Sequence, residues 1–153
     1  MQQFLYSQTG LVLTKSFEGL RLASYQDCAG VWTIGYGHTG TGVRQGVTIT
    51  EPVADQFLQE DLAEAIGCVN RGVTATISQN QFDAMVDFCF NVGRGNFLKS
   101  TLLRNVNSED FAAAMAQFEL WVHAGGEVVA GLVRRRKAEA AMFAGLFEAP
   151  ARA

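Results

Sequence analysis

The sequence predicts an α+β protein in which one helix precedes a small antiparallel sheet and five further helices follow. One glycine-rich stretch, residues 24–50, holds six glycines among β-branched and aromatic residues and has no helical period. The segments on both sides of it carry apolar residues at helical spacing. A content of 48% hydrophobic residues with two prolines excludes disordered and collagen-like chains. With 153 residues, the chain is large enough to bury a core as one domain.

The first helix is predicted over residues 8–18, where Leu11, Leu13 or Thr14, and Phe17 lie at helical spacing. Gly19 follows as a stop signal, so this helix ends at Glu18. Residues 24–50 then form the small, irregular antiparallel sheet.

Helix-start signals locate two helices after the glycine-rich stretch. Thr50 is a candidate N-cap with Pro52 in the first turn, and this helix is predicted to run to about Cys68. Ser78 and Gln81 have the spacing of a capping box, and the helix after them is apolar on most of its circumference, which predicts a place in the middle of the core. Three further helices are predicted: a short one near 96–105, one near 108–122 with Asn107 or Ser108 as cap, and one near 132–147, with a glycine-bearing loop at 125–131.

Charge and cysteine content restrict the possible function classes. The net charge is −3, but residues 131–153 are basic, which suits either an anionic polymer or an ordinary solvated helix face. The Arg134–Lys137 cluster has no recognised nucleic-acid module beside it, so we expect no nucleic-acid partner. Three cysteines leave at least one thiol unpaired within the chain, which fits synthesis in a reducing compartment.

Several kinds of motif are absent from the sequence. No apolar run approaches the ~20 residues of a membrane span, and the start of the chain lacks a signal-peptide pattern, so we expect no stable membrane insertion and no export route within this chain. No zinc-ligand spacing, phosphate loop or serine-nucleophile elbow occurs, so we expect neither metal nor cofactor.

Two carboxylates and a hydroxyl near the front suit the hydrolysis of a glycosidic bond. Such hydrolysis needs an acid for the departing oxygen and usually a second carboxylate that activates water. Glu18 at the helix end, Asp27 in a polar turn and Thr33 on a strand supply these groups. From the residues alone, the non-catalytic interpretations are favoured: a solvated acid at a helix end, an Asx turn and a β-forming threonine.

The segment FEGLRLASYQDCAGVWTIGYGHTG, residues 17–40, resembles the front of the phage-type (T4/P22-like) lysozymes, the endolysin family of muramidases. The shared pattern is Glu, eight residues, Asp, five residues, Thr, then Ile-Gly-x-Gly-His. The resemblance continues in the runs at 79–93 and 131–143, and in Trp121. It implies a lysozyme-like fold, a single domain over 1–153 with a sheet-bearing lobe at about 19–60 and a helical lobe at about 70–150 that includes the N-terminal helix.

The resemblance also implies roles for individual residues. Glu18 is expected to be the general acid, and Asp27, helped by Thr33, to position water for hydrolysis of the β-1,4 bond between N-acetylmuramic acid and N-acetylglucosamine, with inversion. Substrate-binding positions are expected at Asn91, Phe90, Thr39 and Arg135, the last of which matches an arginine that pairs with the catalytic glutamate in relatives. His38, Arg136 and Glu139 are expected to be structural residues near the site.

The biological setting follows from the same resemblance. We expect a monomer that acts on bacterial peptidoglycan, made in the host cytoplasm and released to the periplasm and cell wall by a separate, holin-type pore protein. Two alternatives stay open: a lytic transglycosylase that cleaves the same bond without water, and a non-catalytic relative that binds peptidoglycan.

Overall fold

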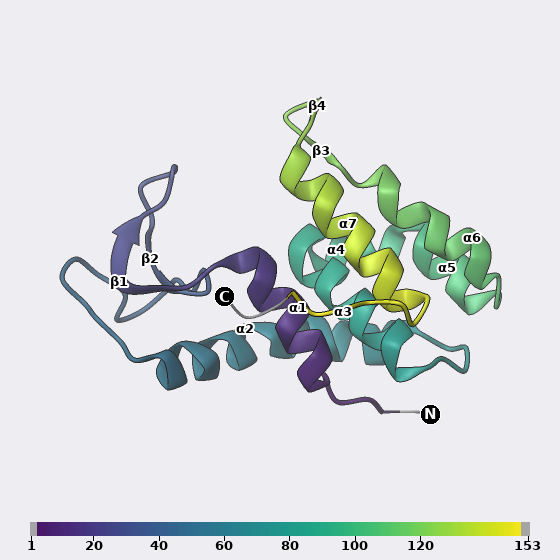
Figure 1. Cartoon of the computed structure of the whole chain (residues 1–153), viewed down its shortest axis with the longest axis horizontal. Helices are drawn as coiled ribbons and strands as arrows, with labels where there is room; N and C mark the ends of the chain where they lie inside the picture. The colour runs from purple at the N-terminus through teal and green to yellow at the C-terminus, as the bar shows by residue number, and fades with distance from the viewer. Residues whose placement is uncertain (1–2, 151–153) are drawn as a thin grey trace. The chain divides into compact units, whose positions relative to one another are not determined.

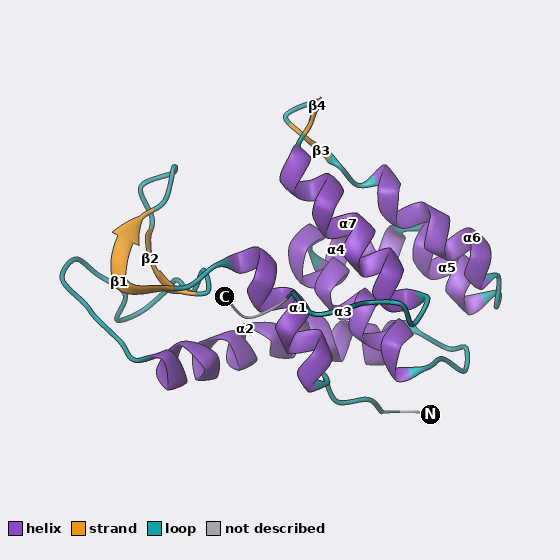
Figure 2. Ribbon diagram, in the orientation of Figure 1, coloured by secondary structure: helices purple, strands orange, loops and turns teal. Residues whose placement is uncertain are grey.

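The computed structural model describes residues 3–150 and confirms the α+β class. Figure 2 shows that strands occur in two short hairpins and that most of the remaining chain is helical. The chain divides into two compact units: Thr14–Ala63, here called the sheet unit, and the described residues before and after it, here called the helical unit. Along the chain the elements are α1 (Gln8–Glu18), β1 (Arg21–Gln26), β2 (Trp32–Gly35), α2 (Glu51–Gly72), α3 (Gln79–Val92), α4 (Arg94–Lys99), α5 (Thr101–Asn107), α6 (Phe111–Gln117), a 3₁₀ turn (Phe118–Leu120), β3 (His123–Ala124), β4 (Glu127–Val128) and α7 (Ala130–Phe143).

In the sheet unit, the predicted antiparallel sheet has two strands. Strands β1 and β2 pair antiparallel, with Tyr25 opposite Thr33 and an irregularity in register toward Arg21. An isolated antiparallel β-bridge between Ala23 and Thr48 connects the end of the glycine-rich stretch to β1. Helix α1 has the predicted bounds, whereas α2 runs to Gly72 and so extends beyond its predicted end at Cys68.

In the helical unit, α3 is the central helix. Its predicted capping box is confirmed: the Ser78 hydroxyl accepts from Gln81 N at 3.1 Å, and the Gln81 side chain accepts from Ser78 N at 2.8 Å. Residues 82–89 are all buried, as the apolar circumference predicts. Helix α7 lies against α3 (Figure 1), and the Phe88 ring meets the Phe118 and Trp121 rings edge-on at 5.5 and 5.4 Å.

The region between α3 and α7 differs from the prediction. A single helix near 96–105 is wrong, because Ser100 adopts an extended conformation that separates α4 from α5 while its hydroxyl caps α5 at Leu103 N. The cap of the next helix is Asp110, which accepts from Ala113 N, so the expectation of Asn107 or Ser108 is also wrong. The predicted loop at 125–131 contains the turn and the second strand of the hairpin β3–β4, and the first two residues of α7.

The cysteines are free thiols in this structure. Cys68 and Cys89 are buried, and Cys28 is exposed. Burial raises the pKa of Cys89 to about 12, with a further contribution from Cys68. Within residues 3–150, no helix combines the length and apolar character that crossing a membrane requires.

Candidate active site

Glu18 is the last residue of α1 and is partly buried. The chain leaves the helix at Gly19, whose φ of 69° lies in the left-handed region that suits glycine. The Glu18 carboxylate lies beside the turn after β2, because a Cβ at Gly37 would sit 3.6 Å from Glu18 Oε2. With a φ of 87°, Gly37 lets the backbone make this turn next to the carboxylate.

Asp27 and Thr33 are joined through the peptide groups of one residue, Val31. Asp27 Oδ1 accepts hydrogen bonds from Val31 N and Ala29 N, both at 2.9 Å. The Val31 carbonyl in turn accepts from Asp27 N and from Thr33 Oγ1, also at 2.9 Å. Thr33 is buried and Asp27 is exposed, so the carboxylate is oriented by the turn and keeps acceptor capacity toward solvent.

His38 follows the turn formed by Tyr36 and Gly37. Its backbone exchanges two hydrogen bonds with Ile34, and its ring stacks on Phe57 with centroids 4.2 Å apart. His38 Nδ1 lies 2.9 and 3.1 Å from the two carboxylate oxygens of Asp61 on α2. This nitrogen is therefore engaged by Asp61, while Thr39, the next residue, is exposed.

The other predicted site residues belong to the helical unit, where a buried charge network links α3 and α7. Arg135 donates through Nε and Nη2 to both oxygens of Asp87, each at 2.9 Å. Arg136 contacts both oxygens of Glu139, at 2.7 and 2.9 Å, and donates to Asn91 Oδ1 at 2.7 Å. Asn91 is itself exposed at the end of α3, so Arg136 orients a surface amide from within the core.

Burial perturbs the protonation of this network. Desolvation raises the pKa of Glu139 well above its ordinary value, and the charge of Asp87 adds to the effect while both arginines oppose it. Desolvation likewise lowers the pKa of Arg136, opposed by Glu139. Each direction is that of a charged group removed from water.

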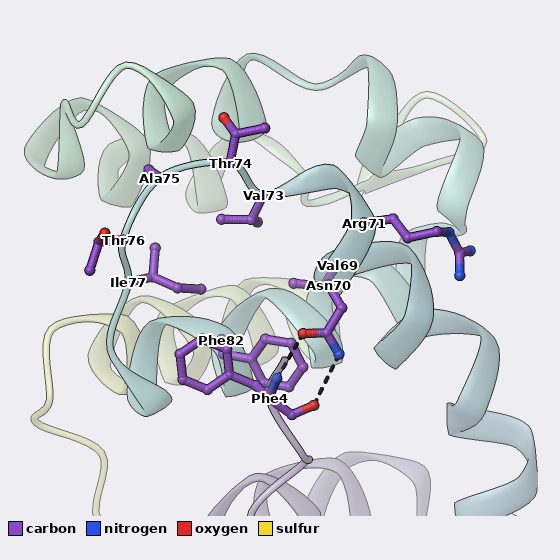
Figure 3. Close-up of a pocket in the computed structure, with 10 residues that line it drawn as sticks. All are labelled: Phe4, Val69, Asn70, Arg71, Val73, Thr74, Ala75, Thr76, Ile77 and Phe82. Atoms are coloured by element: carbon purple, nitrogen blue, oxygen red, sulfur yellow. Dashed lines mark hydrogen bonds between the residues drawn. The ribbon is translucent and has the colours of Figure 1, made fainter. Parts of the chain in front are cut away.

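Two cavities lie in the helical unit. One of about 330 Å³ is lined by Asn91 and Arg136, together with Val92, Asn96, Leu120, Trp121, His123 and Leu132. The other, of about 370 Å³, lies beneath the loop between α2 and α3 (Figure 3). There the Asn70 amide is occupied by the backbone of Phe4, whose ring stacks on Phe82 with centroids 5.0 Å apart. No predicted site residue lines this second cavity.

Sequence analysis missed the partners of several site residues. Asp61 faces His38 and Asp87 faces Arg135, and no local pattern indicates either pairing. One sequence signal for a buried charge pair was available: Asp83 and Asp87 lie four residues apart in a helix that is otherwise mostly apolar. A buried acid requires a partner, so these residues indicate that a basic or polar group faces α3. Among residues 3–150, no group of three potential metal ligands occurs.

Comparison with known proteins gives consistent matches. The phage lysozyme family model matches residues 15–139. An endolysin of Acyrthosiphon pisum secondary endosymbiont phage 1 is 43% identical over 141 residues, which cover 90% of this chain and 96% of that protein. Against two endolysins of Bacillus phages, the chain spans about half of their length.

Two solved structures are similar over nearly the whole chain. The muramidase domain of SpmX from Asticaccaulis excentricus is 41% identical with a TM-score of 0.84, covering 91% of this chain and 97% of that one. A P22 lysozyme mutant is 38% identical with a TM-score of 0.84, covering 94% and 99%.

Proposed function

This chain belongs to the phage lysozyme family and is a muramidase-type endolysin, a glycoside hydrolase, and we propose that Glu18 is its general acid. The observation that carries the proposal is the arrangement within the sheet unit. Glu18 ends α1 beside the Gly37 turn that follows β2, and Asp27 and Thr33 are joined through the N–H and C=O groups of Val31 in the turn that precedes β2. Glu18 protonates the departing glycosidic oxygen, which is the step that bond cleavage requires.

Asp27 and Thr33 position the attacking water in this proposal. The Asx-type turn holds the Asp27 carboxylate toward solvent, and Thr33 Oγ1 donates to a carbonyl and so keeps its lone pairs for a water proton. Attack by this water on the face opposite the leaving group inverts the anomeric centre. The substrate is the β-1,4 bond between N-acetylmuramic acid and N-acetylglucosamine of bacterial peptidoglycan.

Residues outside this trio bind substrate or support the site. Asn91 binds the sugar, supported by its place on the wall of the 330 Å³ cavity and by Arg136 behind it. Phe90, Thr39 and Arg135 are further substrate-binding positions, proposed from family likeness. His38, Arg136 and Glu139 have structural roles, which their paired, buried or half-buried side chains support.

The setting of the reaction is proposed from family membership alone. The enzyme acts as a monomer, is made in the host cytoplasm, and reaches the wall through a separate pore protein of the holin type. Lysis of cells that express the enzyme with and without such a pore protein tests the route, and rapid lysis without it would contradict the route.

Glu18→Gln and Asp27→Asn test the chemistry, because both replacements keep the side-chain shape. Each should abolish the release of fragments from purified peptidoglycan while the melting temperature stays that of the wild type. Glu60→Gln on the exposed face of α2 is the matched control and should retain full activity. Wild-type turnover by Glu18→Gln would refute the assignment of the acid.

Mass analysis of the digest separates the two alternatives from the proposal. Hydrated reducing ends support hydrolysis, anhydro-muramic ends would identify a lytic transglycosylase, and binding without products would identify a non-catalytic relative. The configuration of the freshly formed anomeric carbon, read by NMR, tests inversion.

A further inference from the structure

In the sheet unit, Lys15, Asp55 and Tyr36 form a polar cluster one helical turn from Glu18. Lys15 on α1 places Nζ 2.8 Å from Asp55 Oδ1 on α2. The same ammonium lies 5.5 Å from the centroid of the Tyr36 ring, within the range of a cation–π contact. Three separate elements, α1, the turn after β2 and α2, therefore meet at these side chains.

Two of the three residues are close in sequence to Glu18 or to the turn beside its carboxylate. Lys15 and Glu18 are three residues apart on α1 and so share one face of its last turn. Tyr36 precedes Gly37, the residue whose backbone lies beside the Glu18 carboxylate.

The α2 side of the cluster is held by close packing. At Gly35, with a φ of 66°, a Cβ would come within 3.3 Å of the Cβ of Ala54, the neighbour of Asp55. The turn thus sits directly on α2 at this point.

We propose that Lys15, Tyr36 and Asp55 form a positioning cluster that fixes the Glu18 carboxylate against the turn after β2 and hence relative to Thr33. None of the three takes part in the chemistry. The proposal rests on the proposed role of Glu18 and extends it, because it assigns a positioning role to three residues outside the family motif of acid, aspartate and threonine.

The state of Tyr36 agrees with a positioning role. The side chain is only 7% exposed, and burial raises its pKa, with further contributions from the charges of Asp55 and Glu51. The phenol therefore stays neutral, so it cannot serve as a general base near neutral pH. Its ring gives Lys15 an apolar and π-rich surface to lie on, while Asp55 supplies the counter-charge.

The test compares variants of the full chain by kcat and KM on purified glycan strands. Lys15→Met and Asp55→Asn should each lower kcat about tenfold and leave KM within about twofold, because a displaced acid slows the chemical step without weakening binding. Lys15→Arg should restore most of kcat, since an arginine also pairs with Asp55 and lies on an aromatic ring. The double variant should lose no more than either single one, because both remove the same contact.

Arg44→Met, an exposed cation in the same unit, is the matched control and should leave kcat unchanged. Wild-type kcat in both Lys15→Met and Asp55→Asn, beside an inactive Glu18→Gln, would overturn the positioning role alone. An active Glu18→Gln would overturn both the cluster and the proposed acid. If Asp55→Asn does not fold, the comparison of Lys15→Met with Lys15→Arg at this half-buried position decides, and equal kcat in these two variants would overturn the proposal.

Discussion

Removal of the buried guanidinium of Arg136 should cost more stability than any surface change. Its side chain is 1% exposed, contacts both oxygens of Glu139 and holds the Asn91 amide. Arg136→Met keeps much of the volume but leaves the fully buried Glu139 with Arg135, whose Nε is 3.8 Å away. Breaking a buried ion pair in this way costs about 3–5 kcal/mol. At about 2–4 °C per kcal/mol for a chain of this size, the melting temperature should fall by about 6–20 °C.

Thermal and urea unfolding of five proteins, the wild type, Lys137→Met, Arg136→Met, Glu139→Met and the double variant, measure this effect. Lys137→Met, an exposed cation on the same helix, is the control and should change stability by less than about 0.5 kcal/mol. The double variant Arg136→Met and Glu139→Met should be more stable than Arg136→Met alone, because it leaves no buried carboxyl without its arginine partner. A loss below about 1 kcal/mol in Arg136→Met, or costs that simply add in the double variant, would refute the reasoning.

Three further predictions concern protonation and capping. Because burial raises the pKa of Glu139, the folded state binds the Glu139 proton more tightly than the unfolded state does. The free energy of unfolding should therefore fall as the pH rises above the unfolded pKa of about 4.3. Glu139→Gln should make this dependence on pH flatter in urea titrations, and an unchanged dependence would contradict the prediction. In a native alkylation experiment read by mass spectrometry, the exposed Cys28 should react at neutral pH while Cys89, with its pKa raised to about 12, resists, and equal rates would count against the buried thiol. Ser78→Ala should cost about 1 kcal/mol in urea unfolding by removing the N-cap of α3, and an unchanged midpoint would exclude an energetic role for that cap.

Elements set by short-range signals could be predicted from the sequence. Helix α1 has its predicted bounds because Gly19 takes the left-handed conformation that ends it. The capping box of α3 was predicted because both of its hydrogen bonds lie within four residues. The break at Ser100 could not be predicted in this way. Its side chain caps α5, but the surrounding sequence is equally compatible with one continuous helix and with two short ones.

Long-range partners could not be predicted, because sequence spacing does not encode them. His38 meets Asp61 across 23 residues, and Arg135 meets Asp87 across 48. The chain has 15 carboxylates, so the choice of partner depends on how the helices pack and not on a local pattern. Glu18, Asp27 and Thr33 could be singled out from the sequence only because the family pattern supplies their spacing.

The structure gives a physical reason for the five-residue interval between Asp27 and Thr33. An Asx-type turn returns the chain so that Val31 N reaches the Asp27 carboxylate, and two residues later the strand brings the Thr33 hydroxyl back to the Val31 carbonyl. Inserting one residue in this turn would break the first contact and, through the alternation of a strand, turn the threonine to the other face. Asp27 can therefore form the turn and position the water at the same time, because the turn orients the carboxylate that the water requires. Asp27→Asn separates them, because an amide oxygen keeps the turn and loses the charge.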